Sequence, residues 1–212
     1  MMIKNRGFLS DYCEKVALMA QILGGYMKVY VFLAEGFEEV EAIFPADIMR
    51  RAGLDVLLVS CSGELAVKGA HDIVVTCDAL LDEVLSAPLP DAVVLPGGMP
   101  GAVNLAQSKG VSSLVLAMND AKKVIAAICA SPAVAFAAFD VLKGKNYTCY
   151  PGMEKEVPPQ NDGNWKADRV VVDGNLVTSR GPGTAGEFGF ALVDVLLGGG
   201  ASAQLKKGML CV

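Results

Sequence analysis

Residues 124–132 read Val124-Ile125-Ala126-Ala127-Ile128-Cys129-Ala130-Ser131-Pro132, and this segment decides the fold of the chain. Its apolar part is typical of a buried strand that ends at Cys129, and a helix-like run, 133–139, begins directly after it. A nucleophile on a tight strand-to-helix turn needs small neighbours, here Ala127, Ala130 and Ser131. The N-terminus of the next helix would favour the Cys129 thiolate. The alternative is that Cys129 is a small buried hydrophobic residue.

Strand and helix patterns alternate on both sides of this segment. Strands are predicted at 28–33, 54–60, 73–76, 91–95 and 124–128, helices at 38–52, 80–86, 103–107, 111–119 and 185–197, and a hairpin at 169–178 around Asp173-Gly174-Asn175. Continuous apolar strands between helices indicate an α/β fold with one doubly wound, mostly parallel sheet and helices on both faces. Pro45 is expected to kink the first helix or to mark a restart.

Bulk composition excludes several classes of function. The 212 residues carry a net charge of −5, and no cluster of lysine or arginine exceeds two, so nucleic acid is not expected as the main partner. The chain has six cysteines without a Cys-x-x-Cys pair and one histidine, which argues against a metal site. Scattered cysteines suggest a reducing compartment, and we expect a cytoplasmic protein.

The first 26 residues are expected to be an extension ahead of a single domain at 27–212. The apolar stretch 16–23 is too short to span a bilayer, so no membrane segment is predicted. Asp11, Glu14 and Lys15 interrupt what would be the core of a signal peptide. A targeting role for residues 1–26 stays open.

Three distant turns follow strand ends, where ligands bind in folds of this kind. They are 34–38, 96–99 and 129–130. Among the carboxylates of the first helix turn, Glu41 is expected to face the next strand end, where burial beside the thiolate would keep it protonated. Gly97 and Gly98 offer backbone N–H groups to an oxyanion, although Pro-Gly-Gly alone is more often only a turn.

With these residues together, the chain resembles the ThiJ/PfpI superfamily and, within it, the DJ-one family, from about Met27 to Leu205. The motifs that carry the resemblance are Glu35-Gly36-Phe37-Glu38-Glu39-Val40-Glu41, Pro45-Ala46-Asp47, Met49-Arg50-Arg51-Ala52-Gly53, Val94-Leu95-Pro96-Gly97-Gly98, Ala126-Ala127-Ile128-Cys129-Ala130 and Thr178-Ser179-Arg180-Gly181-Pro182-Gly183-Thr184. The resemblance implies a flavodoxin-like homodimer, with the first helix and its residues Phe44 and Ile48 at the dimer contact.

The resemblance also implies the roles of the site residues. Cys129 would be the reactive, oxidisable cysteine, Glu41 its protonated partner, and Gly98 and Ala130 the backbone donors. The same pocket would include Gly97, Tyr150, Arg51, Gly181 and Pro182. His71 matches an arginine that reaches from the partner subunit, although an exposed loop histidine is the simpler interpretation.

One departure concerns the histidine that the human-type branch has near the cysteine, because Tyr150 takes that place here. Histidine-dependent peptidase or amidotransferase activity is therefore not expected. The resemblance implies cofactor-independent processing of small α-oxoaldehydes or glycated groups, of the glyoxalase or protein deglycase type, linked to oxidative stress. A non-enzymatic redox sensor or chaperone acting through oxidation of Cys129 is the alternative, and the family also carries a label of thiazole monophosphate biosynthesis.

Overall fold

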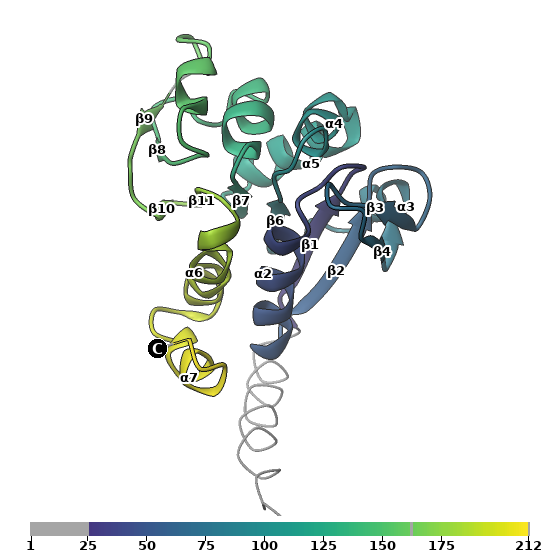
Figure 1. Ribbon diagram of the computed structural model, residues 1–212, viewed down its shortest axis with the longest axis vertical. Coiled ribbons are helices and arrows are strands. Elements are labelled where there is room, and N and C mark those ends of the chain that lie inside the picture. Colours follow the sequence, from purple (N-terminus) through teal and green to yellow (C-terminus); the bar gives the residue numbers. More distant parts are fainter. Residues whose placement is uncertain (1–25, 162, 212) are drawn as a thin grey trace, which may run out of the picture.

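The computed structural model describes residues 26–161 and 163–211, and a seven-stranded sheet forms its centre (Figure 1). The strand order is β10-β11-β7-β6-β1-β2-β5. The strands are β1 (Lys28–Leu33), β2 (Asp55–Ser60), β5 (Ala79–Leu80), β6 (Ala92–Leu95), β7 (Val124–Ile128), β10 (Val170–Asp173) and β11 (Leu176–Ser179). All pairs are parallel except the β10–β11 hairpin. The predicted mostly parallel sheet is therefore confirmed.

Helices cover both faces of this sheet. They are α2 (Glu39–Arg51), α3 (Leu81–Leu85), α4 (Gly101–Gln107), α5 (Lys109–Asp120), α6 (Ala185–Leu197) and α7 (Ser202–Gly208), with shorter turns η1 (Pro132–Phe136), η2 (Met153–Glu156) and η3 (Pro182–Thr184). Alternate residues of β1 enter two separate cores: Val31 packs with α2 and α6, whereas Phe32 packs with α4 and α5. This alternation is what a doubly wound sheet requires.

Seven short elements were not predicted from the sequence: β3, β5, β8, β9, η2, η3 and α7. Two small sheets, β3 (Ala66–Lys68) with β4 (Val74–Thr76) and β8 (Asn146–Tyr147) with β9 (Asn164–Trp165), lie apart from the central sheet, and of their strands only β4 overlaps a predicted strand. The missed strands have two or three residues, which are too few to show a hydrophobic period.

The expected restart at Pro45 is wrong, because α2 runs without interruption through this residue. The helix packs closely against α6, at Gly189. If Gly189 carried a Cβ atom, that atom would lie 3.0 Å from the Cα of Pro45 and 2.9 Å from Cδ1 of Ile48, so only a glycine fits at this contact. This packing offsets the hydrogen bond that proline cannot donate. It also buries Ile48 completely, so Ile48 is not on the exposed side of the helix.

No helix among the described residues is both long and apolar enough to cross a membrane. The predicted extension at 1–26 lies outside the described residues apart from Tyr26, and its role stays a prediction.

Candidate active site

Cys129 occupies the turn directly after β7, and its backbone is strained. Its φ of 64° lies in the left-handed region, which non-glycine residues rarely adopt. Such a conformation costs on the order of 1–3 kcal/mol and persists only where the surroundings hold it. Here the Cys129 N–H donates to the carbonyl of Ser179 at 3.0 Å, and its own carbonyl accepts the Tyr150 N–H at 2.8 Å. The strained turn predicted for this cysteine is thus present.

Gly97 brings the cysteine and Glu41 together. A Cβ on Gly97 would lie 2.6 Å from Cβ of Cys129 and 2.6 Å from Oε2 of Glu41, so no side chain fits between them. The Gly97 N–H donates to the same Oε2 at 2.9 Å. Gly98 is equally restricted, since its φ is +87° and a Cβ would lie 2.4 Å from the backbone N of Glu38. Both residues of the Pro-Gly-Gly turn therefore have more than a turn-forming role.

Burial raises the pKa of Glu41 from its ordinary 4.5 to about 7. Hydrogen bonds with the Cys129 thiol and the Gly97 N–H act in the opposite direction. The carboxyl is fully buried, and its second oxygen, Oε1, has no hydrogen-bond partner among the described residues. A carboxyl in this position is able to hold a proton near neutral pH and to donate it locally.

The sequence analysis expected the following helix to favour the Cys129 thiolate, and the pKa of this thiol shows that burial has the larger effect. Burial, followed by the charge of Glu41, raises the pKa of Cys129, and the N–H groups of Ala130 and Gly98 only partly oppose this. The helix after the cysteine spans residues 131–138 and includes the π-helical segment η1, so the predicted helix is present. Burial outweighs the effect of its dipole on the thiol. Cys129 and Glu41 are coupled and titrate as a pair.

Tyr150 and Gly181 border the free side of the Glu41 carboxyl. A Cβ on Gly181 would lie 3.6 Å from Cδ2 of Tyr150 and 3.9 Å from Oε1 of Glu41. The Tyr150 side chain is half-exposed, whereas Gly181 is buried. Pro182 follows Gly181 as the exposed first residue of η3. The structure thus brings Tyr150, Gly181, Glu41 and Cys129 to one place.

Arg51 is not brought to this place within the chain. It lies at the C-terminal end of α2, ten residues after Glu41, which corresponds to about 15 Å along a helix. Its Nε donates to Asp47 at 2.7 Å, and both side chains are exposed. Arg51 therefore forms an ion pair on the helix surface and no contact with the Cys129 pocket of its own chain.

His71 lies on an exposed loop and pairs with Glu39. Its Nδ1 is 2.9 Å from Oε2 of Glu39, and its backbone N–H donates to Oε1 at 2.8 Å. The hydrogen bond to Glu39, followed by the charge of Glu38, raises the pKa of His71. The exposed-loop interpretation describes this geometry, and an approach to a partner subunit stays a prediction.

A group of possible metal ligands lies at this loop and was not predicted from the sequence. It consists of one ligand atom from each of Glu38, Glu39 and His71, and these atoms lie within 4.8 Å of one another. Both oxygens of Glu39 already accept hydrogen bonds from the 71–73 loop, so this carboxylate is satisfied without an ion.

Two supporting residues were also missed. Ser131, fully buried, donates its hydroxyl to the carbonyl of Pro96, and Ser179 anchors the cysteine backbone. Nothing in the local sequence distinguishes these serines from other small turn residues, because their partners lie 35 and 50 positions away along the chain.

Fold and site together define an α/β domain with a cysteine on a strained strand-to-helix turn and a protonatable glutamate beside it. The sequence profile of the DJ-1/PfpI family matches residues 27–195, and the chain belongs to this family. The Danio rerio Parkinson disease protein 7 homolog is 36% identical over 183 residues, covering 86% of this chain and 96% of that protein. The Caenorhabditis elegans protein named glutathione-independent glyoxalase DJR-1.2 is 33% identical over 175 residues, covering 82% and 90% of the two chains.

A solved structure agrees with the sequence comparison. The crystal structure of Drosophila melanogaster DJ-1beta superposes with a TM-score of 0.82 at 40% identity, covering 87% of this chain and 98% of that chain. The flavodoxin-like α/β fold implied by the sequence motifs is therefore confirmed.

Proposed function

We propose that the protein converts small α-oxoaldehydes to 2-hydroxy acids, with Cys129 as the nucleophile and Glu41 as the proton shuttle, and without a cofactor. The observation that carries the proposal is the buried Glu41 carboxyl, whose pKa of about 7 lets it both hold and release a proton near neutral pH. Gly97 holds it against the cysteine. The Caenorhabditis elegans relative named as a glyoxalase supports this class of reaction.

The reaction begins when the Cys129 thiolate adds to the aldehyde carbon and the resulting oxyanion takes the Glu41 proton, which gives a hemithioacetal. The N–H groups of Ala130 and Gly98, which hydrogen bond the sulfur, stabilise the thiolate before attack. The Glu41 carboxylate then removes a proton from the former aldehyde carbon, whose electron pair forms an enediolate, and returns this proton to the neighbouring carbon. The hydroxyl proton moves to the neighbouring oxygen, so one carbon is oxidised and the other reduced.

The product of this transfer is a thioester of a 2-hydroxy acid on Cys129. Water hydrolyses the thioester and releases the acid, leaving a thiol and a carboxylate that again share one proton. The net reaction adds one water to the oxoaldehyde and needs no external oxidant or reductant. Early adducts of oxoaldehydes with amino groups offer the same carbonyl chemistry, which extends the proposal to glycated groups.

Purified protein with methylglyoxal tests the proposal. We expect loss of methylglyoxal with one lactate formed for each molecule consumed, and no turnover in Cys129→Ser. Cys211→Ser is the matched control, since Cys211 is exposed near the C-terminus and should leave turnover unchanged. Equal turnover in Cys129→Ser and the wild type would contradict the proposal.

A second candidate function is that of a redox sensor. It is favoured by Oε1 of Glu41, which has no hydrogen-bond partner among the described residues and is therefore free to bind an oxidised form of Cys129. Hydrogen peroxide oxidises a thiolate to a sulfenate and then a sulfinate, each step transferring one oxygen atom and releasing water. A protonated Glu41 could donate a hydrogen bond to the sulfinate. Intact mass after peroxide treatment should then show a stable gain of two oxygen atoms on Cys129, and Glu41→Gln should change its yield.

A further inference from the structure

Two buried hydroxyl groups, those of Ser179 and Thr184, lie 2.7 Å apart where β11 ends beside the Cys129 turn. We propose that they form a positioning pair, which holds the backbone of Cys129 and the adjoining loop 180–183 in one fixed arrangement. The pair touches no reacting atom and acts through the residues that it holds. This inference rests on the proposed function, because it names what keeps the nucleophile of that site in place.

The hydroxyl of Thr184 uses its hydrogen-bonding capacity within the chain. Its oxygen accepts the backbone N–H groups of Arg180 at 3.2 Å and Gly181 at 3.1 Å. Ser179 donates its own hydroxyl proton to the carbonyl of Arg169 at 2.8 Å. The short contact between the two hydroxyl oxygens therefore has Thr184 as its donor and Ser179 as its acceptor.

Ser179 carries this arrangement to the nucleophile. Its carbonyl accepts the Cys129 N–H at 3.0 Å, which is one of the two backbone bonds that hold Cys129 at its φ of 64°. The side chain of Ser179 is held on two sides, by the carbonyl of Arg169 and by the hydroxyl of Thr184. A strained backbone persists only where its surroundings hold it, so a looser Ser179 would let the cysteine turn relax.

Thr184 also fixes the loop that lies next to Glu41. A Cβ on Gly181 would lie 3.9 Å from Oε1 of Glu41, and both bonds of the Gly181 peptide groups to Thr184 close this loop: the N–H to Oγ1 at 3.1 Å and the carbonyl to the Thr184 N–H at 2.8 Å. Valine has the shape of threonine without its hydroxyl. Thr184→Val would therefore leave three buried or half-buried polar groups without a partner, and both sides of the site would lose a common support.

The test compares Thr184→Val with Thr184→Ser in methylglyoxal turnover. We expect Thr184→Val to lower kcat and kcat/KM together by about tenfold, because the hydroxyl places the thiol and does not bind the substrate. Thr184→Ser should keep the wild-type values, since serine supplies the same hydroxyl. Unchanged turnover in Thr184→Val overturns the proposal, as does a Thr184→Ser variant that is as slow as Thr184→Val.

Ser202→Ala is the matched control. Ser202 is buried as well, and its hydroxyl donates to Asp194 at 2.8 Å, but it belongs to α7, which follows the far end of α6 (Figure 1). The variant should lose stability, measured by urea denaturation, and keep wild-type turnover. A fall in turnover equal to that of Thr184→Val would mean that lost stability, not lost positioning, slows the enzyme, which also overturns the proposal.

A second measurement depends neither on turnover nor on a variant of Thr184. Hydrogen exchange of the Cys129 amide reports directly on its bond to the Ser179 carbonyl. We expect Ser179→Ala, like Thr184→Val, to lose part of the wild-type protection of this amide, and Ser202→Ala to retain it. Lost protection in a protein without oxoaldehyde turnover would support the positioning pair and refute the proposed function. Full protection in Ser179→Ala and Thr184→Val, together with wild-type turnover, would refute the pair and leave the proposed function intact.

Discussion

The hydroxyl of Ser131 donates to the carbonyl of Pro96 at 2.5 Å and so joins the turn after β7 to the turn after β6. One turn holds the cysteine, and the other holds the glycines that face it. Both partners of the bond are buried. This hydrogen bond therefore helps to hold the turn of Cys129 against the turn of Gly97 and Gly98.

Ser131→Ala is expected to lower the free energy of unfolding by about 1–3 kcal/mol, because it leaves a buried carbonyl without its donor. Turnover should fall as well, since the two turns lose their common anchor. Urea denaturation and methylglyoxal kinetics measure the two effects. Ser113→Ala, on the exposed side of α5, is the matched control and should change neither.

Glu41→Gln is expected to make the protein more stable at pH 8 and to have little effect on stability near pH 4. The folded pKa of Glu41, about 7, lies above its ordinary 4.5. Its stabilising contribution is therefore complete below about pH 4.5 and is lost as the pH rises through 7. The loss amounts to about 3 kcal/mol. Glutamine carries no charge and escapes this penalty.

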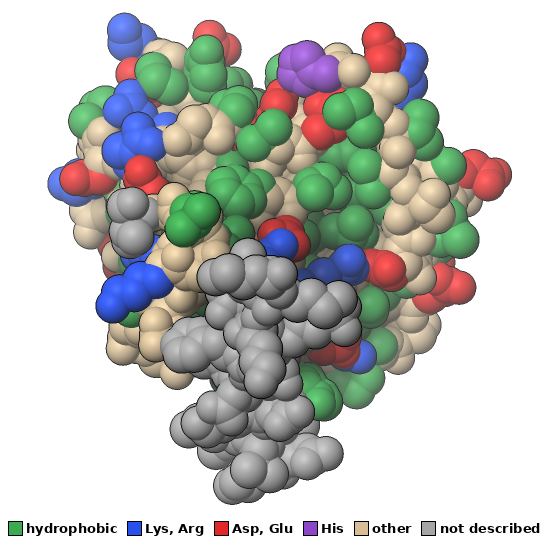
Figure 2. All heavy atoms as spheres, turned by 60° about the horizontal axis from the view of Figure 1, so that its bottom comes forward, with side chains coloured by type: hydrophobic (Ala, Val, Ile, Leu, Met, Phe, Trp, Pro, Cys, Tyr) green, Lys and Arg blue, Asp and Glu red, His purple; other side chains and the backbone are tan. Residues whose placement is uncertain are grey.

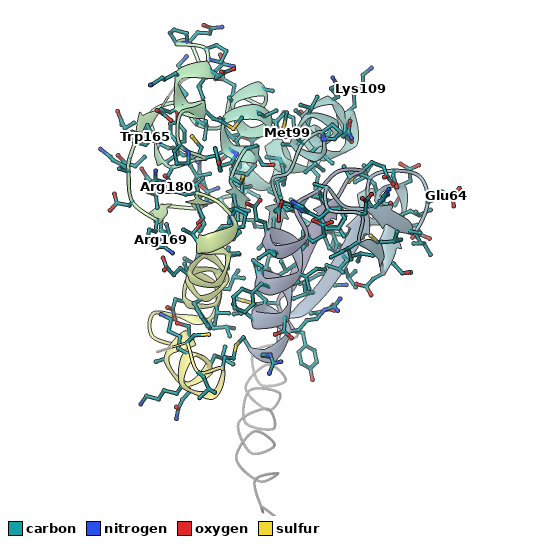
Figure 3. All side chains as sticks on the ribbon, in the orientation of Figure 1. Glu64, Met99, Lys109, Trp165, Arg169 and Arg180 are labelled. Carbon is teal, nitrogen blue, oxygen red and sulfur yellow. The ribbon has the colours of Figure 1, made fainter. Side chains whose placement is uncertain are left out.

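Denaturation of wild type and Glu41→Gln across this pH range measures the difference. Glu64→Gln is the control, because Glu64 is exposed at the edge of the molecule (Figure 3). Parallel stability curves for the wild type and Glu41→Gln would show that burial does not raise the pKa of Glu41.

The rate of Cys129 alkylation should depend on pH through the shared proton. As the pH rises through about 7, the pair loses its first proton, and the remaining proton can sit on Glu41 and leave a thiolate on Cys129. We expect an increase in iodoacetamide rate with a midpoint near pH 7, and no such step in Glu41→Gln. A wild-type rate that rises only above pH 9 would mean that the remaining proton stays on sulfur.

His71 should titrate above its ordinary pKa of 6.5, because Glu39 binds its protonated ring. The chain contains one histidine, so its ring signals in a proton NMR spectrum need no assignment. Glu39→Gln should move the midpoint down toward 6.5. If His71 also approaches a partner subunit's pocket, His71→Ala should change the pH profile of activity; an unaltered profile would limit His71 to its loop.

A homodimer is expected to use the outer side of α2, where Val40 is 47% and Ile43 39% exposed. Apolar side chains lie on the same face of the molecule as the single histidine (Figure 2). Val40→Asp combined with Ile43→Asp should shift sedimentation velocity from dimer to monomer. Val172→Asp, at the exposed position of β10, is the control and should leave the dimer intact. A wild type that sediments as a monomer at micromolar concentration would contradict the prediction.

Much of the fold was predictable because its long elements carry clear periods. The strand before Cys129 is a continuous apolar run, and small residues surround the turn, so the strained backbone was expected and is present. The pairing of Glu41 with Cys129 followed from two strand ends meeting at one sheet edge, and the structure places them on either side of Gly97.

Other features depended on packing that the sequence does not display. Pro45 continues the helix because α6 lies against it, which no local pattern reveals. Burial, not the helix terminus, dominates the pKa of Cys129, and burial depends on the whole assembled fold. Arg51 sits at the far end of α2 because helix geometry separates it from Glu41, whatever motif it belongs to.

The position of Gly97 has a consequence for how such a site can be altered. Since any side chain there would overlap both Cys129 and Glu41, the spacing of these two residues admits no adjustment from that side. Under the proposed function, a change of substrate would have to come from exposed residues near the site, such as Tyr150 and Pro182. The backbone at Gly97 fixes the spacing of Cys129 and Glu41, whereas these exposed side chains can be exchanged.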